Sequence, residues 1–467
     1  MLSASQSLHV SFVEVPHDEG FVQAPNPSKA MKIVSVHNTY QQPGGEDIVF
    51  EQEKRMLERA NHRVVTFTRS NHEIGKLNIL GQIGIAKRTV WSSDARAEFD
   101  KLLEREKPDI VHVHNTFMLI SPSIYSACRD RGVPVVQTLH NFRLLCPSSN
   151  LFRDNHVCEE CLDDGLWRSV QHACYRHSRP ATATVVLMLA WHRAFKTWDK
   201  CIARYIALTN FAREKFVAAG LPADRIVVKP NFLESDPGPR EQSGEYAVFI
   251  GRLSPDKGAA ALLQAWEKLP QQYPLQIVGD GDLRGELEAK VRERGLNVTF
   301  RGHLSREESI LTLKGARFLV MPSLGYETFG MVIVEGFACG IPAVASRLGA
   351  MQEIVRDRVT GLHFTPGDAT DLAQKVEWAW NHPLEIEAMG REGRREYEER
   401  YTAKKNYEML MRVYEGVVQT RGRSESAVNY ETAPSKDLEK LDASRKNAEN
   451  PLNADCAKTV PSPQIVV

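Results

Sequence analysis

The chain has 467 residues, of which 42% are hydrophobic, and its 59 lysines and arginines are balanced by 59 aspartates and glutamates. This composition is that of an ordinary soluble protein with room for two or three domains. The balanced charge provides no overall attraction to nucleic acid, so we expect no nucleic-acid partner. No run of about 18 apolar residues is present, which argues against a membrane-spanning helix.

The beginning of the chain lacks a basic region followed by an apolar stretch, so we expect no signal peptide. Four of the eight cysteines fall in one cluster, as in an intracellular protein with a single local cysteine site. The sequence therefore predicts a cytoplasmic protein.

Short apolar strands alternate with helical stretches along the chain, which is typical of parallel α/β architecture. In the first half, strands are expected at residues 33–36, 64–67, 110–114, 134–139, 206–209 and 227–229, with helices such as 46–60 and 95–106. In the second half, strands are expected at residues 247–250, 275–278, 298–300, 318–321 and 343–345, with helices at 259–268, 283–294, 307–315 and 332–339. Residues 234–244 between the two series are rich in Pro, Gly, Ser and charge, as in a linker.

This pattern predicts two Rossmann-like α/β domains, at residues 31–235 and 245–400, with a Cys-rich insertion at 143–178 in the first one. The end segments 1–30 and 420–467 are polar and poor in aromatic residues, so we expect a disordered extension and a disordered tail. Ligands of open α/β sheets bind beyond the carboxyl ends of the strands. The loops at those ends are therefore where chemistry is expected.

In the first domain, two such loops stand out. Gly44-Gly45-Glu46 opens a helix, where backbone amides can approach an anion. His140 and Asn141 follow a strand, and an imidazole at this place can hydrogen-bond a reacting sugar. A plain tight turn and a structural histidine are the alternatives, and His112 and His114 in the neighbouring strand are more doubtful still.

In the second domain, Arg252 and Lys257 lie five residues apart around a glycine-containing turn after a strand. Two cations at this spacing can clamp a pyrophosphate. The next loop, at Gly279 and Gly281, resembles a dinucleotide fingerprint whose third glycine comes one residue late. It is a weak signal for NAD and fits a loop that lets a nucleotide approach closely.

The most informative loop runs from Glu327 to Glu335 and opens an apolar helix. The two carboxylates are eight residues apart, slightly over two helical turns, so we expect them on one side of the helix. Glu335 is suited to ribose hydroxyls and Glu327 to the sugar. Gly330 at the helix start leaves amides free for phosphate.

These motifs, which are Gly44-Gly45-Glu46, Thr138 to Asn141, Gly251 to Gly258 and the pair Glu327 and Glu335, occur in the same order in family 4 glycosyltransferases. The chain resembles that family from about residue 31 to about residue 418. The resemblance implies the GT-B fold, in which two Rossmann-like domains face each other across a cleft, with an N-terminal acceptor domain and a C-terminal donor domain. It also implies that a last helix, at residues 401–419, crosses back to the first domain.

The resemblance further implies a hexosyltransferase that moves a sugar from a UDP- or GDP-linked donor with retention of anomeric configuration. It implies no cofactor and no metal for catalysis. A glycan or lipid-linked intermediate of bacterial surface polysaccharide biosynthesis is the implied acceptor. The rival hypotheses are a non-catalytic, zinc-stabilised nucleotide-binding regulator and an NAD-dependent dehydrogenase.

By motif match, five residues of the second domain are implied to hold the phosphates and ribose of the donor. Arg252 and Lys257 are implied to hold the pyrophosphate and Glu335 the ribose. Phe329 and Gly330 are implied to present backbone amides.

The catalytic residues implied by the same match are His140, beside the anomeric centre, and Glu327, on the hydroxyls of the donor sugar. Gly45 is placed near the donor phosphates, and the Gly279 loop near the nucleotide.

The cysteine cluster consists of Cys146, Cys158, Cys161 and Cys174, with the spacing Cys-x11-Cys-x2-Cys-x12-Cys. Four thiolates can hold a structural zinc ion and order a segment with little core of its own. Only one Cys-x2-Cys pair is present, so free thiols, a disulfide or an iron–sulfur cluster stay open as alternatives. A subset of family 4 enzymes resembles this chain in carrying such an insertion.

The segment 181–195 is apolar and has basic neighbours at Arg179, Arg193 and Lys196. Two interpretations fit it. It is either core beside the insertion or a helix that touches the inner face of a membrane.

Overall fold

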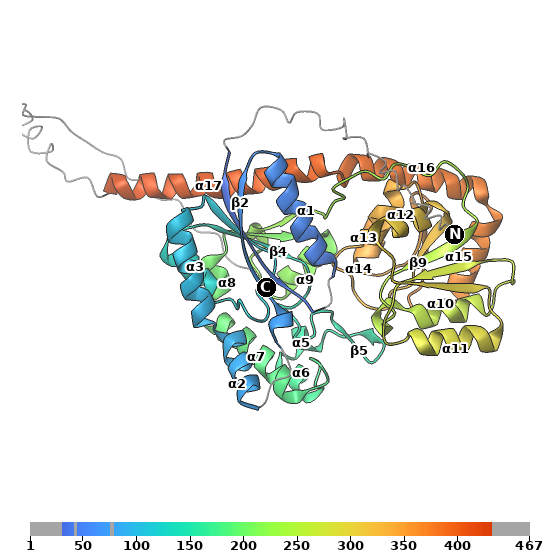
Figure 1. The fold of residues 1–467 in the computed structure, drawn as a ribbon, viewed down its shortest axis with the longest axis horizontal. Helices are drawn as coiled ribbons and strands as arrows, with labels where there is room; N and C mark the ends of the chain where they lie inside the picture. The colour runs from blue at the N-terminus through green and yellow to red at the C-terminus, as the bar shows by residue number, and fades with distance from the viewer. Residues whose placement is uncertain (1–29, 42–43, 75–78, 432–467) are drawn as a thin grey trace, which may run out of the picture. The chain divides into compact units, whose positions relative to one another are not determined.

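The computed structural model describes residues 30–41, 44–74 and 79–431 (Figure 1). Residues up to Val418 belong to one unit, which contains both α/β domains, and residues from Gln419 onward belong to a second unit. Except for Ala30, the extension expected at residues 1–30 lies outside the described residues, as does the tail from residue 432.

The N-terminal domain is built on a six-stranded sheet with the order β2-β1-β3-β4-β7-β8, in which every pairing is parallel. Its strands are β1 (Lys32–Thr39), β2 (Arg63–Ser70), β3 (Ile110–Val113), β4 (Val135–Leu139), β7 (Arg204–Ala207) and β8 (Ile226–Val228). Its helices outside the insertion are α1 (Gly45–Arg59), α2 (Ile79–Val90), α3 (Ser93–Glu106), α4 (Ile124–Asp130) and α9 (Asn210–Ala218). The order reverses beside β1, since β2 lies on one side of it and β3 on the other.

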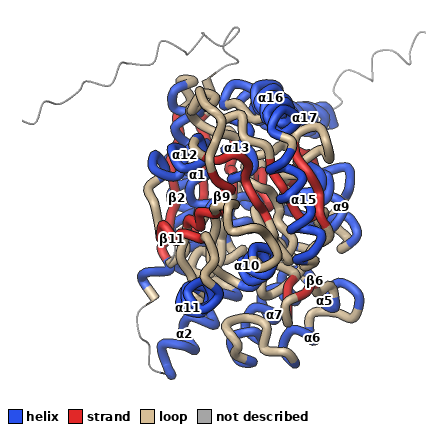
Figure 2. The backbone as a smooth tube through the Cα atoms, turned by 90° about the vertical axis from the view of Figure 1, so that its right-hand side faces the viewer, coloured by secondary structure: helices blue, strands red, loops and turns tan. Residues whose placement is uncertain are grey.

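The C-terminal domain repeats this plan with the strand order β11-β10-β9-β12-β13-β14. Figure 2 shows the molecule from the side of this domain. Its strands are β9 (Tyr246–Ile250), β10 (Leu275–Val278), β11 (Val298–Gly302), β12 (Ala316–Met321), β13 (Ala343–Ser346) and β14 (Gly361–Phe364). Its helices are α10 (Ala259–Trp266), α11 (Arg284–Arg294), α12 (Arg306–Lys314), α13 (Met331–Ala338), α14 (Gly349–Ile354), α15 (Ala369–Asn381) and α16 (Pro383–Arg400). Here the order reverses between β9 and β12, which is where open sheets of this kind bind ligands.

Both sheets are buried on their two faces, which explains why their strands read as short, continuous apolar runs. The prediction of two Rossmann-like α/β domains is confirmed. The strand expected at residues 206–209 ends two residues earlier, because Thr209 caps α9 by accepting a hydrogen bond from the Ala212 amide at 3.2 Å. The four residues of β14 were not predicted, since Gly361 and His363 interrupt its apolar run.

The last helix, α17 (Ala403–Glu431), begins just after the C-terminal domain. Leu410, Met411 and Tyr414 of this helix pack in one cluster with Ile33 and Ile110 of the first sheet. The expected end of the helix at residue 419 is wrong, because α17 continues to Glu431. Residues 421–431 contain no proline, so the polar composition that indicated disorder is also compatible with helix.

The Cys-rich insertion follows β4 and has little regular structure. It consists of the antiparallel pair β5 (Phe152–Arg153) and β6 (His156–Val157) and the short helices α5 (Glu160–Asp163) and α6 (Trp167–Gln171). It leads into α7 (Arg179–Ala194) and α8 (Thr197–Cys201). Within the described ranges, no helix combines the length and apolar character needed to cross a membrane.

Candidate active site

Two loops of the C-terminal domain meet where its strand order reverses. The loop after β9 ends in a 3₁₀ turn at Pro255–Lys257, and the loop after β12 carries Glu327. The Lys257 ammonium forms an ion pair with the Glu327 carboxylate. That carboxylate also accepts a hydrogen bond from the Ser323 hydroxyl at 3.1 Å. The two loops are therefore held together by charge at the place where a nucleotide is expected.

Two glycines of this region are required by close backbone contacts. Gly258 has a φ of +71°, and a Cβ there would lie 1.9 Å from the carbonyl oxygen of Pro322. Gly279 has a φ of +131°, and its Cβ would lie 2.0 Å from the carbonyl oxygen of Gly251. The Gly279 amide already donates to the carbonyl of Gly302 at 2.8 Å. Gly279 thus determines how closely its loop packs, while its amide is engaged within the domain.

Helix α13 begins at the same edge, with Gly330 as its N-cap. The first amides of a helix have no acceptor inside it, so this end suits an anion. The Phe329 side chain is buried and packs edge-on against Tyr401, with ring centroids 6.0 Å apart. Its side chain therefore belongs to the core, which leaves its backbone for ligand contact. Arg252 is exposed and makes no ion pair with any residue of the described ranges.

Glu335 lies inside α13, whereas Glu327 lies in the loop before the helix begins at Met331. The expectation that the two carboxylates share one side of a helix is therefore wrong, because the helix starts only after Gly330. Burial raises the pKa of Glu335 to about 7, and the charge of Arg306 offsets part of this effect. A half-buried carboxylate with so high a pKa is typical of a ligand-binding position.

His140 follows β4 in the N-terminal domain and contacts the loop after β12 in the other domain. This loop carries Glu327 and is called the donor loop below, after the role that the sequence predicts for it. Its backbone oxygen accepts a hydrogen bond from the Thr328 hydroxyl at 2.7 Å. His140 also lines a pocket whose walls mix polar and apolar side chains. These walls include Asn115, Thr116, Gln137, Arg143, Met188 and Trp198. The pocket is formed by the N-terminal domain, beside the residue expected near the anomeric centre.

The start of α1 lies against the same loops. Gly45 is the first residue of the helix, and a Cβ added there would meet nothing within 4 Å. Glu46 accepts hydrogen bonds from Asn115 at 3.0 Å and from Asn141 at 2.9 Å. Burial raises the pKa of Glu46, while the charge of His37 opposes that rise. Glu46 thereby ties the glycine-containing turn to the ends of β3 and β4.

The four clustered cysteines line a single pocket in the insertion. All four are free thiols, which excludes a disulfide among them in this structure. A hydrogen bond from Cys161 holds the pKa of Cys146 below its usual range. In the described ranges, the metal-type ligand atoms that lie within 4.8 Å of one another are those of Glu53, His112 and His114. The four sulfur atoms do not form such a group, so they lie farther apart than a bound metal would hold them.

The insertion also touches the donor loop. The position of Gly325 is so close to Phe152 that a Cβ there would lie 3.3 Å from the Phe152 ring. Burial, together with a hydrogen bond to Glu159, raises the pKa of Tyr326 above its ordinary range. Residues 152 and 159 of the insertion therefore pack against the loop that carries Glu327.

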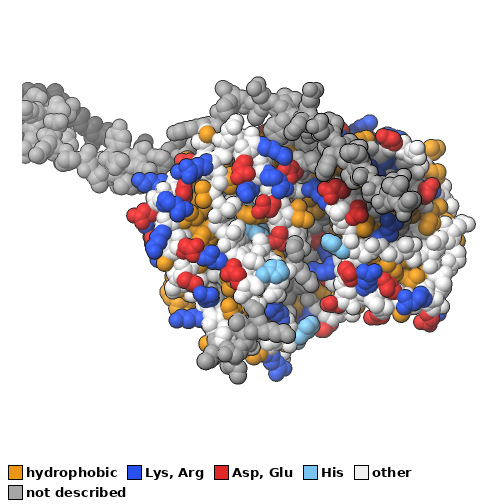
Figure 3. All heavy atoms as spheres, in the orientation of Figure 1, with side chains coloured by type: hydrophobic (Ala, Val, Ile, Leu, Met, Phe, Trp, Pro, Cys, Tyr) orange, Lys and Arg blue, Asp and Glu red, His pale blue; other side chains and the backbone are white. Residues whose placement is uncertain are grey.

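Helix α7 has two different faces. Val185, Met188 and Leu189 are buried, as expected for core. Trp191 and Phe195 are 44% and 58% exposed, and their rings contact each other at 4.7 Å between centroids. On the face of the molecule drawn in Figure 3, lysines and arginines are interspersed with acidic side chains.

Sequence reasoning did not find Glu53 and Lys229, which are both buried and lie 3.3 Å apart. Glu53 is on the same side of α1 as the buried residues Val49, Met56 and Leu57. A carboxylate on an apolar helix face was the signal available in the sequence. The doubtful histidines, His112 and His114, contact this same carboxylate.

Taken together, the fold and the loops define a two-domain Rossmann-like protein in which one edge of the second sheet is suited to an anion. Its two halves match two family models. Residues 43–236 match "Glycosyltransferase Family 4", and residues 233–396 match "Glycosyl transferases group 1". The chain is thus a glycosyltransferase of the GT-B type, with a family 4 N-terminal half and a group 1 C-terminal half.

Curated relatives agree with this assignment. The 2-deoxystreptamine glucosyltransferase of Streptomyces kanamyceticus is 27% identical over 350 residues, which cover 73% of this chain and 85% of the relative. The D-rhamnosyltransferase WbpZ of Pseudomonas aeruginosa is 34% identical over 168 residues, or 35% of this chain and 44% of the relative. The phosphatidyl-myo-inositol mannosyltransferase of Mycobacterium tuberculosis is 32% identical over 187 residues, or 37% and 48%.

Solved structures share the fold at low sequence identity. Anabaena Alr3699/HepE in complex with UDP aligns with a TM-score of 0.59 and 18% identity, over 83% of this chain and 100% of that one. The lipopolysaccharide outer core galactosyltransferase WaaB aligns with a TM-score of 0.55 and 18% identity, over 81% and 98%.

The raised pKa of Glu335 makes a prediction about stability. The folded protein binds the Glu335 proton more tightly than the unfolded chain, whose pKa is near 4.5. Stability from this group is therefore complete below about pH 4.5 and is lost as the pH rises to about 7. Replacing Glu335 by Gln should stabilise the protein at pH 8 by at most about 3 kcal/mol, with no gain near pH 4.5.

Thermal unfolding of both proteins between pH 4.5 and pH 8 measures this difference. Glu293→Gln removes a carboxylate from a side chain that is 73% exposed and serves as the control. A Glu335→Gln protein whose melting temperature tracks that of the wild type at every pH would show that the carboxylate is not desolvated.

Proposed function

We propose that this protein moves a hexose from a UDP-linked donor to a glycan or lipid-linked acceptor, with retention of anomeric configuration and without a catalytic metal. The observation that carries the proposal is the pairing of Lys257 with Glu327 at the strand-order reversal of the second sheet, beside the start of α13. A cation, a carboxylate and a helix N-terminus in one place match the phosphates and hydroxyls of a nucleotide sugar.

In the proposed donor complex, Lys257 leaves Glu327 for the pyrophosphate, and Arg252 approaches the same group from the exposed side. Glu327 is then free to accept hydrogen bonds from sugar hydroxyls. Glu335 in its ionised form accepts hydrogen bonds from the ribose.

Backbone groups complete the proposed site. The amides of Phe329 and Gly330 face the phosphates at the start of α13, and Gly45 lies near them at the start of α1. Gly279 acts through its missing side chain, which lets the nucleotide approach.

The proposed reaction breaks the bond between the anomeric carbon and the diphosphate oxygen. The acceptor hydroxyl forms the new bond on the same face of the sugar and gives its proton to the departing diphosphate. Negative charge grows on that leaving group, where Arg252, Lys257 and the amides stabilise it. His140 lies beside the anomeric centre and hydrogen-bonds the sugar.

UDP is the proposed nucleotide in preference to GDP, because the structure of Alr3699/HepE, which shares the fold, was solved with UDP and with UDP-glucose. Relatives named as O-antigen chain and phosphatidyl-myo-inositol mannosyltransferases support a glycan or lipid-linked acceptor. The pocket beside His140 is suited to this acceptor, since its polar groups can bind hydroxyls while Met188 and Trp198 offer apolar surface.

Donor binding provides the direct test. Calorimetric titration with UDP, GDP, ADP and NAD should show UDP binding most tightly. Lys257→Ala should weaken UDP binding by about 10- to 100-fold, because a hydrogen bond to a charged group contributes about 1.5–3 kcal/mol.

Transfer from a UDP-hexose to water or acceptor should persist in EDTA, and NMR of the product should show the anomeric configuration of the donor.

Arg294→Ala, at a side chain that is 59% exposed, is the matched control and should bind UDP like the wild type. Binding of NAD without binding of UDP, GDP or ADP would favour the dehydrogenase hypothesis. Tight nucleotide binding without transfer from any UDP- or GDP-sugar would favour the regulator instead.

We propose in addition that the four cysteines bind a structural zinc ion. The common pocket, the free thiols and the lowered pKa of Cys146 beside Cys161 support this proposal. Bound zinc would hold the insertion, with Phe152 and Glu159, against the donor loop.

Elemental analysis of the purified protein should then find about one zinc per chain, and Cys158→Ser together with Cys174→Ser should abolish it. The control is Cys339→Ser, a buried cysteine outside the insertion. A wild-type protein without zinc, purified in the absence of chelators, would contradict the proposal.

We also propose that the exposed face of α7 touches the cytoplasmic face of a membrane. Trp191 and Phe195 supply apolar contact, and the exposed Arg193 and Lys196 supply positive charge. Sedimentation with phosphatidylglycerol-containing vesicles should bring down the wild type, whereas the double variant Trp191→Ser and Phe195→Ser should stay in solution. Leu384→Ser, at a side chain that is 75% exposed in the other domain, should behave like the wild type. Equal sedimentation of all three proteins would contradict the proposal.

A further inference from the structure

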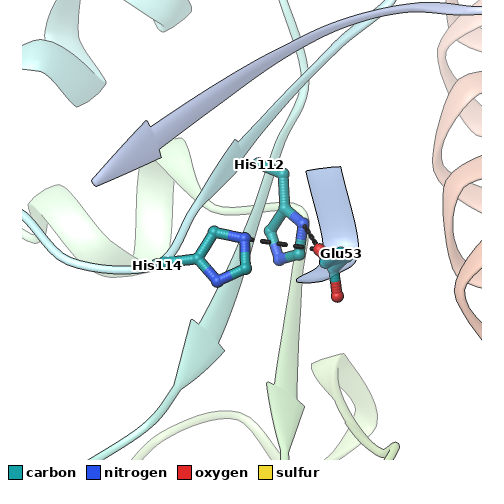
Figure 4. A group of neighbouring side chains, drawn as sticks. All are labelled: Glu53, His112 and His114. Carbon is teal, nitrogen blue, oxygen red and sulfur yellow. Dashed lines mark ion pairs between the residues drawn. The ribbon is translucent and has the colours of Figure 1, made fainter. Parts of the chain in front are cut away.

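A buried polar network lies where the strand order of the first sheet reverses. It contains Glu53 of α1, His112 and His114 at the end of β3, Lys229 after β8 and Tyr414 of α17. The Glu53 Oε1 atom lies 2.8 Å from Nδ1 of His112 and 3.3 Å from Nε2 of His114 (Figure 4). All five side chains are almost completely shielded from solvent.

The network reaches the pocket beside His140 through His114. The Nδ1 atom of His114 lies 3.0 Å from Nε2 of His140. The two rings are nearly parallel, with an angle of 17° between their planes. A continuous chain of contacts therefore runs from Glu53 through His114 to His140.

Glu53 is an anion in this network. Burial alone would raise its pKa, but His112 and Lys229 together hold the pKa of Glu53 well below its usual range. The Lys229 ammonium lies 3.3 Å from the second carboxylate oxygen and donates to Asn406 at 2.9 Å. Because the carboxylate has no proton to give, a nitrogen that faces it must carry one.

This requirement determines which ring nitrogen carries the proton, first in His114 and then in His140. The Nε2 atom of His114 lies 3.3 Å from the Glu53 carboxylate and makes no hydrogen bond of full geometry with any residue that the structure describes. A lone pair on this nitrogen would face an anion, so we place the ring proton on Nε2. Burial lowers the pKa of His114 to about 3, so the ring is neutral and its Nδ1 is an acceptor. The 3.0 Å contact then requires a proton on Nε2 of His140. In a neutral His140, Nδ1 is left as an acceptor.

We propose that Glu53 and His114 are positioning residues that hold His140 as the neutral, Nε2-protonated tautomer, whose Nδ1 accepts a hydrogen bond from a hydroxyl of the bound sugar. The role of His140 toward the sugar rests on the proposed function, whereas its tautomer does not. A neutral acceptor suits this position because the anomeric centre gains positive charge as the leaving group departs, and an imidazolium would oppose that charge.

A metal ion is the competing explanation for the same cluster. Glu53, His112 and His114 each present a ligand atom within 4.8 Å of the others. However, Lys229 already supplies the positive charge beside Glu53, and the Tyr414 hydroxyl lies 2.7 Å from Nδ1 of His112. A divalent cation would bring a second positive charge next to a buried ammonium, which is costly.

The tautomer can be measured directly on the full chain without any donor. Long-range ¹H–¹⁵N spectra of histidine-labelled protein report which ring nitrogen carries the proton, and the variant His140→Asn identifies the His140 signals. We expect the Nε2-protonated form of His140 from pH 8 down to pH 5.5, because burial and the neighbouring histidines lower the pKa of His140. The groups that face His140 are His37, Glu53, His112 and His114.

Variants of His114 test the consequence. His114→Phe keeps the ring shape but removes the acceptor, so His140 should populate both tautomers, and kcat should fall about tenfold or more with little change in the donor KM. His114→Asn, whose amide oxygen can take the place of Nδ1, should recover part of kcat and the Nε2-protonated form. The exposed His72→Phe is the control and should leave both unchanged.

Three results would overturn the proposal. These are an Nδ1-protonated His140 in the wild type, an unchanged kcat in a folded His114→Phe protein, or histidine signals at His112 and His114 that show metal coordination reversible by EDTA. If His114→Phe does not fold, the wild-type spectra and His114→Asn still decide the question. Absence of transfer from every nucleotide sugar would defeat the proposed function, while the spectra would still decide the tautomer.

Discussion

The ion pair between Lys257 and Glu327 is the interaction on which the donor side of the structure depends. It joins the loops after β9 and β12 at the reversal of strand order, where the carboxyl ends of both strands open toward the same edge. Both partners are only partly buried, so each is free to exchange the other for a ligand. In the proposed donor site, this pair would keep the cation for the phosphates and the carboxylate for the sugar in position before the donor binds.

The first domain uses buried charge in a different way. There, Glu53 and Lys229 are buried in a polar network, in which Glu53 contacts His112 and Lys229 donates to Asn406. Such a pair contributes little net stability, since desolvation offsets the attraction. What it can supply is a fixed arrangement of protons next to His140. The C-terminal helix α17 takes part through Tyr414 and Asn406, so the last helix of the chain completes the network of the first domain.

The repeating α/β plan was predictable because buried parallel strands leave short apolar runs that are hard to mistake. The loop carrying Arg252 and Lys257 was predictable for the same reason, since it directly follows the apolar strand β9. The geometry of Glu327 was predicted wrongly, because helical spacing was applied to Glu327 although the helix was itself expected only from residue 332 and begins at Met331. Glu53 and Lys229 were missed because their partners are distant in the sequence, and only the folded sheet brings them together with His112 and His114.

A crystal structure of the protein soaked with UDP would test the central claim most directly. The account predicts that the diphosphate lies against Lys257 and the first amides of α13, that the ribose hydroxyls donate to Glu335, and that Lys257 has separated from Glu327. UDP bound at another place, or bound at this edge with the Lys257–Glu327 pair intact and the ribose away from Glu335, would contradict it.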